Sequence, residues 1–178
     1  PSRTALDWLE ARAREADAAA QAGWLQHLVD LGAAPRAIAV LGRSPDPRDT
    51  ARFDAWLSAL RATRDRDGVQ VAIERAVAVS RDAARLEELA RIALAESLPV
   101  AAERAFSARV EVAPDSLEAR RWLGLLAAAR SDTGAAREHL GHYVVAGGRD
   151  PEALLRHGEL LEREGRVEAA RRAFALGL

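Results

Sequence analysis

The 178-residue chain contains no cysteine, methionine, lysine or asparagine, and only 4% of its residues are aromatic. Without cysteine it can form no disulfide, carry no catalytic thiol and offer no thiolate to a metal ion. All 26 basic residues are arginine, and 27 acidic residues balance them to a net charge of −1. A chain without an excess of positive charge is not expected to bind nucleic acid.

Long apolar runs and catalytic motifs are also missing. No run approaches the roughly 18 residues that a transmembrane helix needs, so we expect no membrane insertion of this segment. The sequence lacks a phosphate-binding GxxxxGK loop, a GxGxxG dinucleotide motif, an HExxH zinc motif and a Ser-His-Asp order. We therefore expect no catalytic residue and no cofactor. The 49% apolar content is enough to build a core and excludes wholesale disorder.

The residues that are abundant favour helices. Alanine makes up nearly a quarter of the chain, and leucine, arginine and glutamate supply much of the rest. Apolar residues recur at spacings of three and four, as at Leu86, Leu89 and Ala93. Glycines and prolines interrupt the pattern every 10 to 16 residues or so, which is the usual length of a globular helix. The composition and spacing predict an all-α fold.

Three columns of matching side chains recur every 34 residues. They are Ala90, Gly124 and Gly158; Ala102, Ala136 and Ala170; and Phe106, Leu140 and Phe174. We interpret each unit as a helix hairpin in which the small residues let two helices approach. The large residues of the third column are expected to fill the space between units. Because no single hairpin covers its own apolar face, neighbouring hairpins must stack.

This pattern resembles the tetratricopeptide repeat (TPR) family, whose motif places a Leu-Gly pair in the first helix and an alanine followed by an aromatic residue in the second. The resemblance is strongest over residues 83–178. It implies an α-solenoid of stacked antiparallel hairpins that winds into a right-handed superhelix. We expect one array over residues 1–178, divided into a leftover helix (4–17), a repeat (18–48), a degenerate repeat (49–82), two repeats (83–116 and 117–150) and a truncated repeat (151–178).

The leftover helix and the truncated repeat indicate a segment of a longer array. In such an array Phe174, Leu176 and Leu178 would be covered by the next unit. Where they are uncovered, we expect self-association through the open terminal repeats.

The resemblance also implies where a partner binds, because ligands of TPR proteins lie on the concave face of the first helices. By position, this face would comprise Glu87, Arg91 and Leu94, then Arg121, Leu125 and Ala128, then Leu155, Glu159 and Glu162. Such a mixture suits a folded protein or a helix, held by apolar anchors and oriented by charge. We expect Arg121→Glu to weaken binding without lowering the melting temperature. Arg171, in a second helix, should tolerate the same change.

Two clusters weakly resemble metal sites. His139 and His142 lie three residues apart beside Glu138, but Leu140 between them is a core position, so the histidines are expected to face solvent. Residues 63–74 partly match a calcium-binding EF-hand loop, although the first ligand position holds a threonine. There we expect Asp67 to cap a helix. We predict no metal site.

His157 replaces a core leucine of the repeat. We expect it to be partly buried and hydrogen-bonded to the backbone.

The leading functional hypothesis is a non-catalytic protein–protein interaction scaffold. The chain also resembles the TPR regions of bacterial exopolysaccharide export and biofilm systems of the Pel, cellulose or alginate type, which implies a periplasmic rather than a cytoplasmic location. The alternative is a regulatory or assembly domain appended to an enzyme such as a glycosyltransferase. The rest of the full-length chain discriminates, since a signal peptide and a C-terminal barrel favour export and a catalytic domain favours the alternative.

Overall fold

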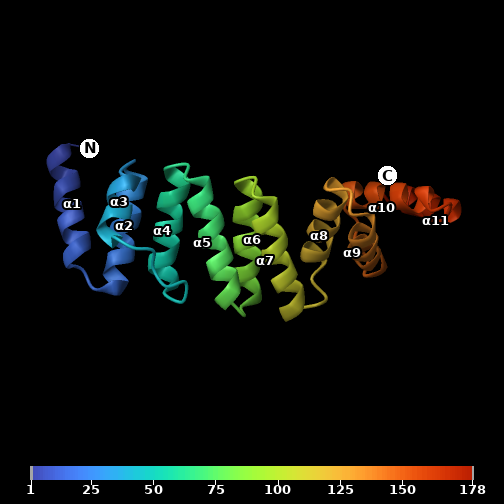
Figure 1. Ribbon diagram of the computed structural model, residues 1–178, viewed down its shortest axis with the longest axis horizontal. Helices are drawn as coiled ribbons and strands as arrows, with labels where there is room; N and C mark the ends of the chain where they lie inside the picture. Colours follow the sequence, from blue (N-terminus) through green and yellow to red (C-terminus); the bar gives the residue numbers. More distant parts are fainter. Residues whose placement is uncertain (1, 178) are drawn as a thin grey trace. The chain divides into compact units, whose positions relative to one another are not determined.

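The computed structural model describes residues 2–177 (Figure 1). Every regular element in that range is a helix, so the all-α prediction is confirmed. The helices are α1 (Arg3–Glu15), α2 (Ala18–Asp30), α3 (Ala34–Leu41), α4 (Thr50–Ala62), α5 (Arg66–Val79), α6 (Ala83–Ala95), α7 (Pro99–Val112), α8 (Leu117–Ala129), α9 (Thr133–Val145), α10 (Pro151–Arg163) and α11 (Val167–Leu176). No helix of the described range is both long and apolar enough to span a membrane.

The chain divides into two compact units, unit 1 (Pro1–Ser80) and unit 2 (Arg81–Leu178). In unit 1, α2 packs against α1, α3 and α4, and α4 packs against α5. Leu25 and Leu28 of α2 and Ala59 of α4 are fully buried in its core. The apolar spacing on α2 therefore places this helix at the centre of unit 1.

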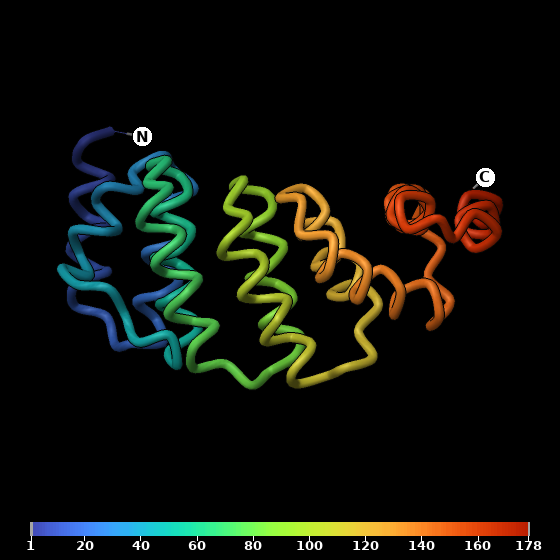
Figure 2. The backbone as a smooth tube through the Cα atoms, turned by 45° about the vertical axis from the view of Figure 1, so that its right-hand side comes forward, coloured from blue at the N-terminus to red at the C-terminus, as the bar shows by residue number. Residues whose placement is uncertain are grey.

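Unit 2 consists of the hairpins α6/α7, α8/α9 and α10/α11. The hairpins stack because α7 packs against α8, and α9 packs against α10. In Figure 2, α10 and α11 lie side by side and nearly end-on, whereas α6 and α7 run along the page. Successive hairpins are thus rotated relative to one another within this unit.

The ends of the helices are set by side-chain caps and by turn residues. Most helices start after an aspartate whose carboxylate accepts a backbone N–H of the first turn. The turn inside each hairpin of unit 2 passes through a residue with positive φ, namely Ser97 (57°), Ser131 (64°) and Gly165 (74°). These positions are also 34 residues apart, so the repeat extends to the backbone conformation of the turn.

The cap of α5 differs from the expectation. The helix starts at Arg66, and Asp65 Oδ1 accepts the Gly68 N–H at 2.9 Å. Asp67 lies within the first turn. The prediction that Asp67 is the cap is wrong, because the helix starts nearer the N-terminus than Gly68 suggested.

Two glycines allow the helices of a hairpin to approach closely. A Cβ added to Gly124 of α8 would lie 2.6 Å from the Leu140 side chain of α9, and one added to Gly158 of α10 would lie 2.2 Å from the Phe174 ring of α11. Leu140 and Phe174 therefore pack inside their own hairpins, which corrects the prediction that they fill the space between units. Phe106 does reach the next hairpin, with its ring centroid 6.4 Å from that of Trp122.

The terminal residues also differ in part from the expectation of exposure. Phe174 is half-buried against its own hairpin, whereas Leu176 is exposed. Leu178 lies outside the described residues. Self-association through this end stays a prediction, with Leu176 as its main apolar contact.

We predict that Gly124→Ala lowers the free energy of unfolding by about 1–3 kcal/mol, because the added methyl overlaps Leu140. Gly141→Ala is the matched control. Its nearest neighbour would be 3.8 Å away, so the better helix propensity of alanine should leave stability unchanged or raised by about 1 kcal/mol. Urea unfolding of both variants measures the difference. Equal midpoints would show that α8 and α9 can separate without cost.

Candidate functional site

The predicted partner-binding residues all lie in unit 2, on α6, α8 and α10. The structure brings three of them together, because Leu125, Ala128 and Glu159 line one cleft between α8 and α10. The cleft has a volume of about 360 Å³. We call it the α8/α10 cleft.

The α8/α10 cleft combines an apolar floor with a charged rim. Leu125 and Leu160 are 9% and 8% exposed and form the floor. Along α10 the rim alternates in sign, with glutamates at 152 and 159 and arginines at 156 and 163. The spacings of four, three and four residues place these side chains on one helix face.

The sequence analysis missed Glu152, Arg156, Leu160 and Arg163. The signal for three of them was present in the helical spacing of the charges on α10. It was hidden because the residues were chosen by their positions in the repeat, which favoured neighbouring faces of the helix.

Two predicted residues of α10 lie outside the α8/α10 cleft. Leu155 is 48% exposed, and Glu162 is also exposed. Neither lines the cleft. They occupy an adjacent strip of α10, one step around the helix.

The residues of α6 form a separate group. The Glu87 carboxylate accepts from Arg91 at 2.5 Å and lies 3.6 Å from Arg109 of α7. Arg91 is exposed, and Leu94 is half-buried. Glu87 is therefore held by its own hairpin, and none of the three lines the α8/α10 cleft.

Arg121 is held in an ion-pair network. Its guanidinium donates to Asp150 at 3.0 Å and to Glu118 at 3.2 Å, and lies 4.5 Å from the Trp122 ring. Asp150 in turn caps α10 by accepting the Ala153 N–H at 2.9 Å. Arg121 thus links α8 to the start of α10, which contradicts the expectation that its charge can be reversed without a loss of stability.

The histidine pair is not arranged as a metal site. Arg120 donates to His139 Nδ1 at 3.2 Å, and His139 is half-buried rather than solvent-facing as expected, whereas His142 is exposed. Burial lowers the pKa of His139, and the charge of Arg120 lowers it further. A cation bonded to the ring nitrogen opposes the binding of a second cation there.

Residues 63–74 do not form an open loop. They are helical from Arg66 onward, so the polar side chains point outward along a helix instead of around one ion. Across residues 2–177, no group of three or more histidine, aspartate or glutamate side chains is placed to hold a metal ion.

His157 is half-buried, as expected, but it makes no bond to the backbone. Its Nδ1 is buried and has no hydrogen-bond partner among the described residues. Burial lowers the pKa of His157, and the charge of Arg166 adds to the effect. The folded chain therefore holds this ring in its neutral form.

Several solved structures share the fold of the chain. One described as a MamA RS-1 ArsTM double mutant has a TM-score of 0.62 and 16% identity, covering 91% of this chain and 93% of its own. A crystal structure of MamA has a TM-score of 0.59 and 15% identity, covering 85% and 90%. A structure from the functional characterization of Pseudomonas aeruginosa pilF has a TM-score of 0.53 and 16% identity, covering 98% and 78%.

These similarities establish the fold, which is an α-solenoid of stacked helix hairpins as predicted. MamA and PilF are TPR proteins, so the fold is TPR-like. No protein-family model matches the chain, and no curated protein matches it in sequence.

We predict that Arg121→Glu lowers the free energy of unfolding by about 1–3 kcal/mol, because it replaces two charge-assisted hydrogen bonds with like-charge contacts to Glu118 and Asp150. Arg171→Glu is the control. That side chain is 73% exposed, and its substitution should change stability by less than about 0.5 kcal/mol. Urea unfolding of the two variants compares them, and a normal midpoint for Arg121→Glu would show that the network contributes nothing.

We predict that His157→Leu makes the chain less sensitive to acid. Because the folded pKa lies below the ordinary value of 6.5, the unfolded chain binds a proton that the folded chain resists, and stability falls as the pH drops below about 6.5. Leucine removes that proton and the unpaired Nδ1. The difference in unfolding free energy between pH 7 and pH 5 should shrink in this variant but not in His142→Leu. The same acid sensitivity in the parent and His157→Leu would be the contrary result.

Proposed function

We propose that the chain is a non-catalytic scaffold that binds another protein, and that the α8/α10 cleft is part of its binding surface. The observation that carries this proposal is the cleft itself, where two arginines and two glutamates surround an apolar floor. Interfaces commonly combine buried aliphatic anchors with a polar rim. The absence of recognisable catalytic motifs in the sequence supports the non-catalytic part.

The apolar floor would supply binding energy. An aliphatic or aromatic side chain of the partner would cover Leu125, Ala128 and Leu160 and displace water from them. Because the floor belongs to two packed helices, it needs little rearrangement before binding. A preformed site loses less conformational entropy on association.

The charged rim would set the direction of the partner. Arg156 and Glu159 pair with each other at 3.0 Å, whereas Glu152 and Arg163 have no ion-pair partner among the described residues. The two unpaired charges are opposite in sign and lie about 16 Å apart along α10, at 1.5 Å per residue. We expect the partner segment to place a basic group near Glu152 and an acidic group near Arg163.

The TPR-like fold is a second support. Stacked helix hairpins present extended surfaces on which other proteins bind, and they do so without an active site. The fold is compatible with many activities, so the cleft and not the fold carries the assignment to a particular surface.

A finer form of the proposal places the scaffold in a periplasmic exopolysaccharide-export system. Its support is the sequence resemblance, namely an irregular, cysteine-free array rich in alanine, leucine and arginine. The competing form is a regulatory or assembly domain of an enzyme. Fractionation of cells that express the full-length protein separates them, because only the export form requires the protein in the periplasm and a loss of secreted polysaccharide when its gene is deleted.

Site-specific photo-crosslinking tests the binding surface. A photoreactive phenylalanine analogue at Ala128, inside the cleft, should give an adduct of one discrete mass in cells that express the full-length protein. The same analogue at Arg171, on exposed α11, is the control and should give none. Adding Arg163→Glu should reduce the Ala128 adduct several-fold. Adducts that form only at Arg171, or that ignore Arg163→Glu, would place the partner elsewhere.

A further inference from the structure

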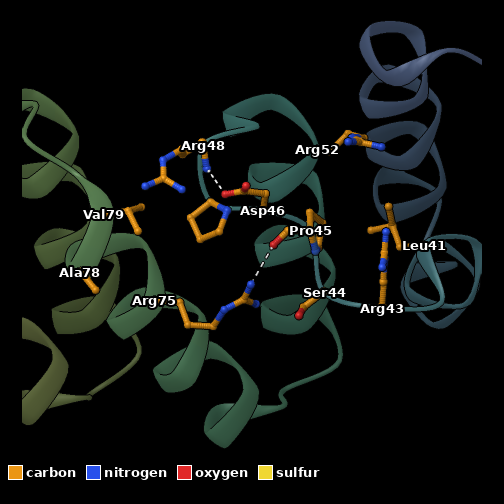
Figure 3. A pocket seen from close by; sticks show the side chains of 11 residues that line it. Leu41, Arg43, Ser44, Pro45, Asp46, Arg48, Arg52, Arg75, Ala78 and Val79 are labelled. Carbon is orange, nitrogen blue, oxygen red and sulfur yellow. Dashed lines mark hydrogen bonds between the residues drawn. The ribbon is translucent and has the colours of Figure 1, made fainter.

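Unit 1 contains a pocket that the proposed function does not use. The segment between α3 and α4, residues 42–49, folds against α5 and encloses a volume of about 680 Å³ (Figure 3). Four arginines line this pocket, against a single acidic residue, Asp46. The arginines are Arg43, Arg48, Arg52 and Arg75. In a chain whose net charge is −1, this is a local concentration of positive charge. We call it the arginine pocket.

Three of the four guanidinium groups lack a carboxylate partner among the described residues. Arg52 pairs with Asp49 at 2.5 Å. Arg75 donates to a neutral acceptor, the Pro45 carbonyl, at 3.1 Å. The side chains of Arg43 and Arg48 make no hydrogen bond or ion pair within residues 2–177, and both residues are exposed. The pocket therefore has charge left to pair with an anion.

The segment that carries these arginines is conformationally restricted. Pro45 is buried, and Arg75 holds its carbonyl. Asp46 accepts the Arg48 N–H through its carboxylate at 2.9 Å and the Asp49 N–H through its carbonyl at 3.0 Å. The rings of Pro45 and Pro47 fix two more backbone angles. The pocket is thus largely formed before a ligand arrives, which lowers the entropic cost of binding.

Apolar side chains alternate with the arginines around the pocket. The apolar lining residues are Leu41, Pro45, Pro47, Ala78 and Val79. In Figure 3, Arg48 and Arg75 lie toward Ala78 and Val79, whereas Arg43 and Arg52 lie toward Leu41. Positive charge is therefore available on both sides of the proline segment, with aliphatic surface beside it on each.

We propose that the arginine pocket is a second binding site, which takes an extended acidic peptide with alternating carboxylate and aliphatic side chains. One carboxylate would bind Arg48 and Arg75, and a second would reach Arg43. Guanidinium groups suit this role, since their planar donors bind a carboxylate through two parallel hydrogen bonds. An aliphatic side chain between the carboxylates would pack on Pro47 and Val79. This site is separate from the α8/α10 cleft, and neither proposal depends on the other.

The apolar lining favours a peptide over other anions. Inorganic phosphate and acidic polysaccharides would satisfy the arginines but would leave the aliphatic lining in contact with water. A peptide can satisfy both, because its side chains alternate along the backbone. Competition between these ligands therefore tests the chemistry of the pocket directly.

Fluorescence polarization with the whole chain tests the proposal. The probe is a fluorescein-labelled hexapeptide of alternating glutamate and leucine. We expect saturable binding, and a loss of about tenfold or more in affinity for Arg48→Glu and for Arg43→Glu. Both residues are exposed, and the Arg48 bond to Asp46 uses only its backbone, so these variants should remain folded. Arg3→Glu, outside the pocket, is the control for net charge and should stay within about twofold of the parent.

Other outcomes would overturn the proposal. Equal weakening by Arg48→Glu and Arg3→Glu would reduce the effect to net charge. A peptide with serine in place of leucine that binds as tightly, or displacement of the probe by equimolar phosphate or an oligouronate, would make the pocket a general anion site. Absence of saturable binding at millimolar peptide would leave the pocket without this ligand.

Discussion

The close contact between a glycine and a large side chain sets the geometry of unit 2. Gly124 admits Leu140, and Gly158 admits Phe174, at distances where no other residue would fit without a shift. This contact brings the two helices of each hairpin together, and the covered apolar face of one hairpin then packs on the next. Because α8 and α10 are both first helices, stacking their hairpins places them side by side. The α8/α10 cleft follows from that arrangement.

The same contact explains why the fold was predictable from the sequence. A 34-residue period in the sizes of Gly124, Leu140 and their counterparts reports the packing directly, because packing depends on side-chain volume at fixed positions. The turn residues Ser97, Ser131 and Gly165 carry the period into the backbone. What the columns could not show was that Leu140 and Phe174 pack within a hairpin, since one period fits contacts inside a unit and between units equally well.

The candidate site was predictable only in part, because charged side chains do not follow the period. Leu125 and Glu159 were placed in the groove by repeat position, and the structure puts both in the cleft. Arg121 was placed there as well, but it bonds to Asp150, 29 residues away. That pairing depends on how a loop returns to the preceding helix, and nothing in the local sequence encodes it. The arginine pocket was missed for the same reason, since its residues come from a loop and from two helices.

The exclusive use of arginine gives these charges a particular character. A guanidinium offers five donors in a plane, so one arginine can bond two carboxylates and cover a ring at once, as Arg121 does with Glu118, Asp150 and Trp122. A lysine would hold such a network only as a point charge. An arginine that meets no carboxylate within its own chain keeps that whole set of donors for a ligand. The informative cations are therefore those left without a carboxylate, Arg163 at the cleft and Arg48 at the pocket, because their donors are available to another molecule.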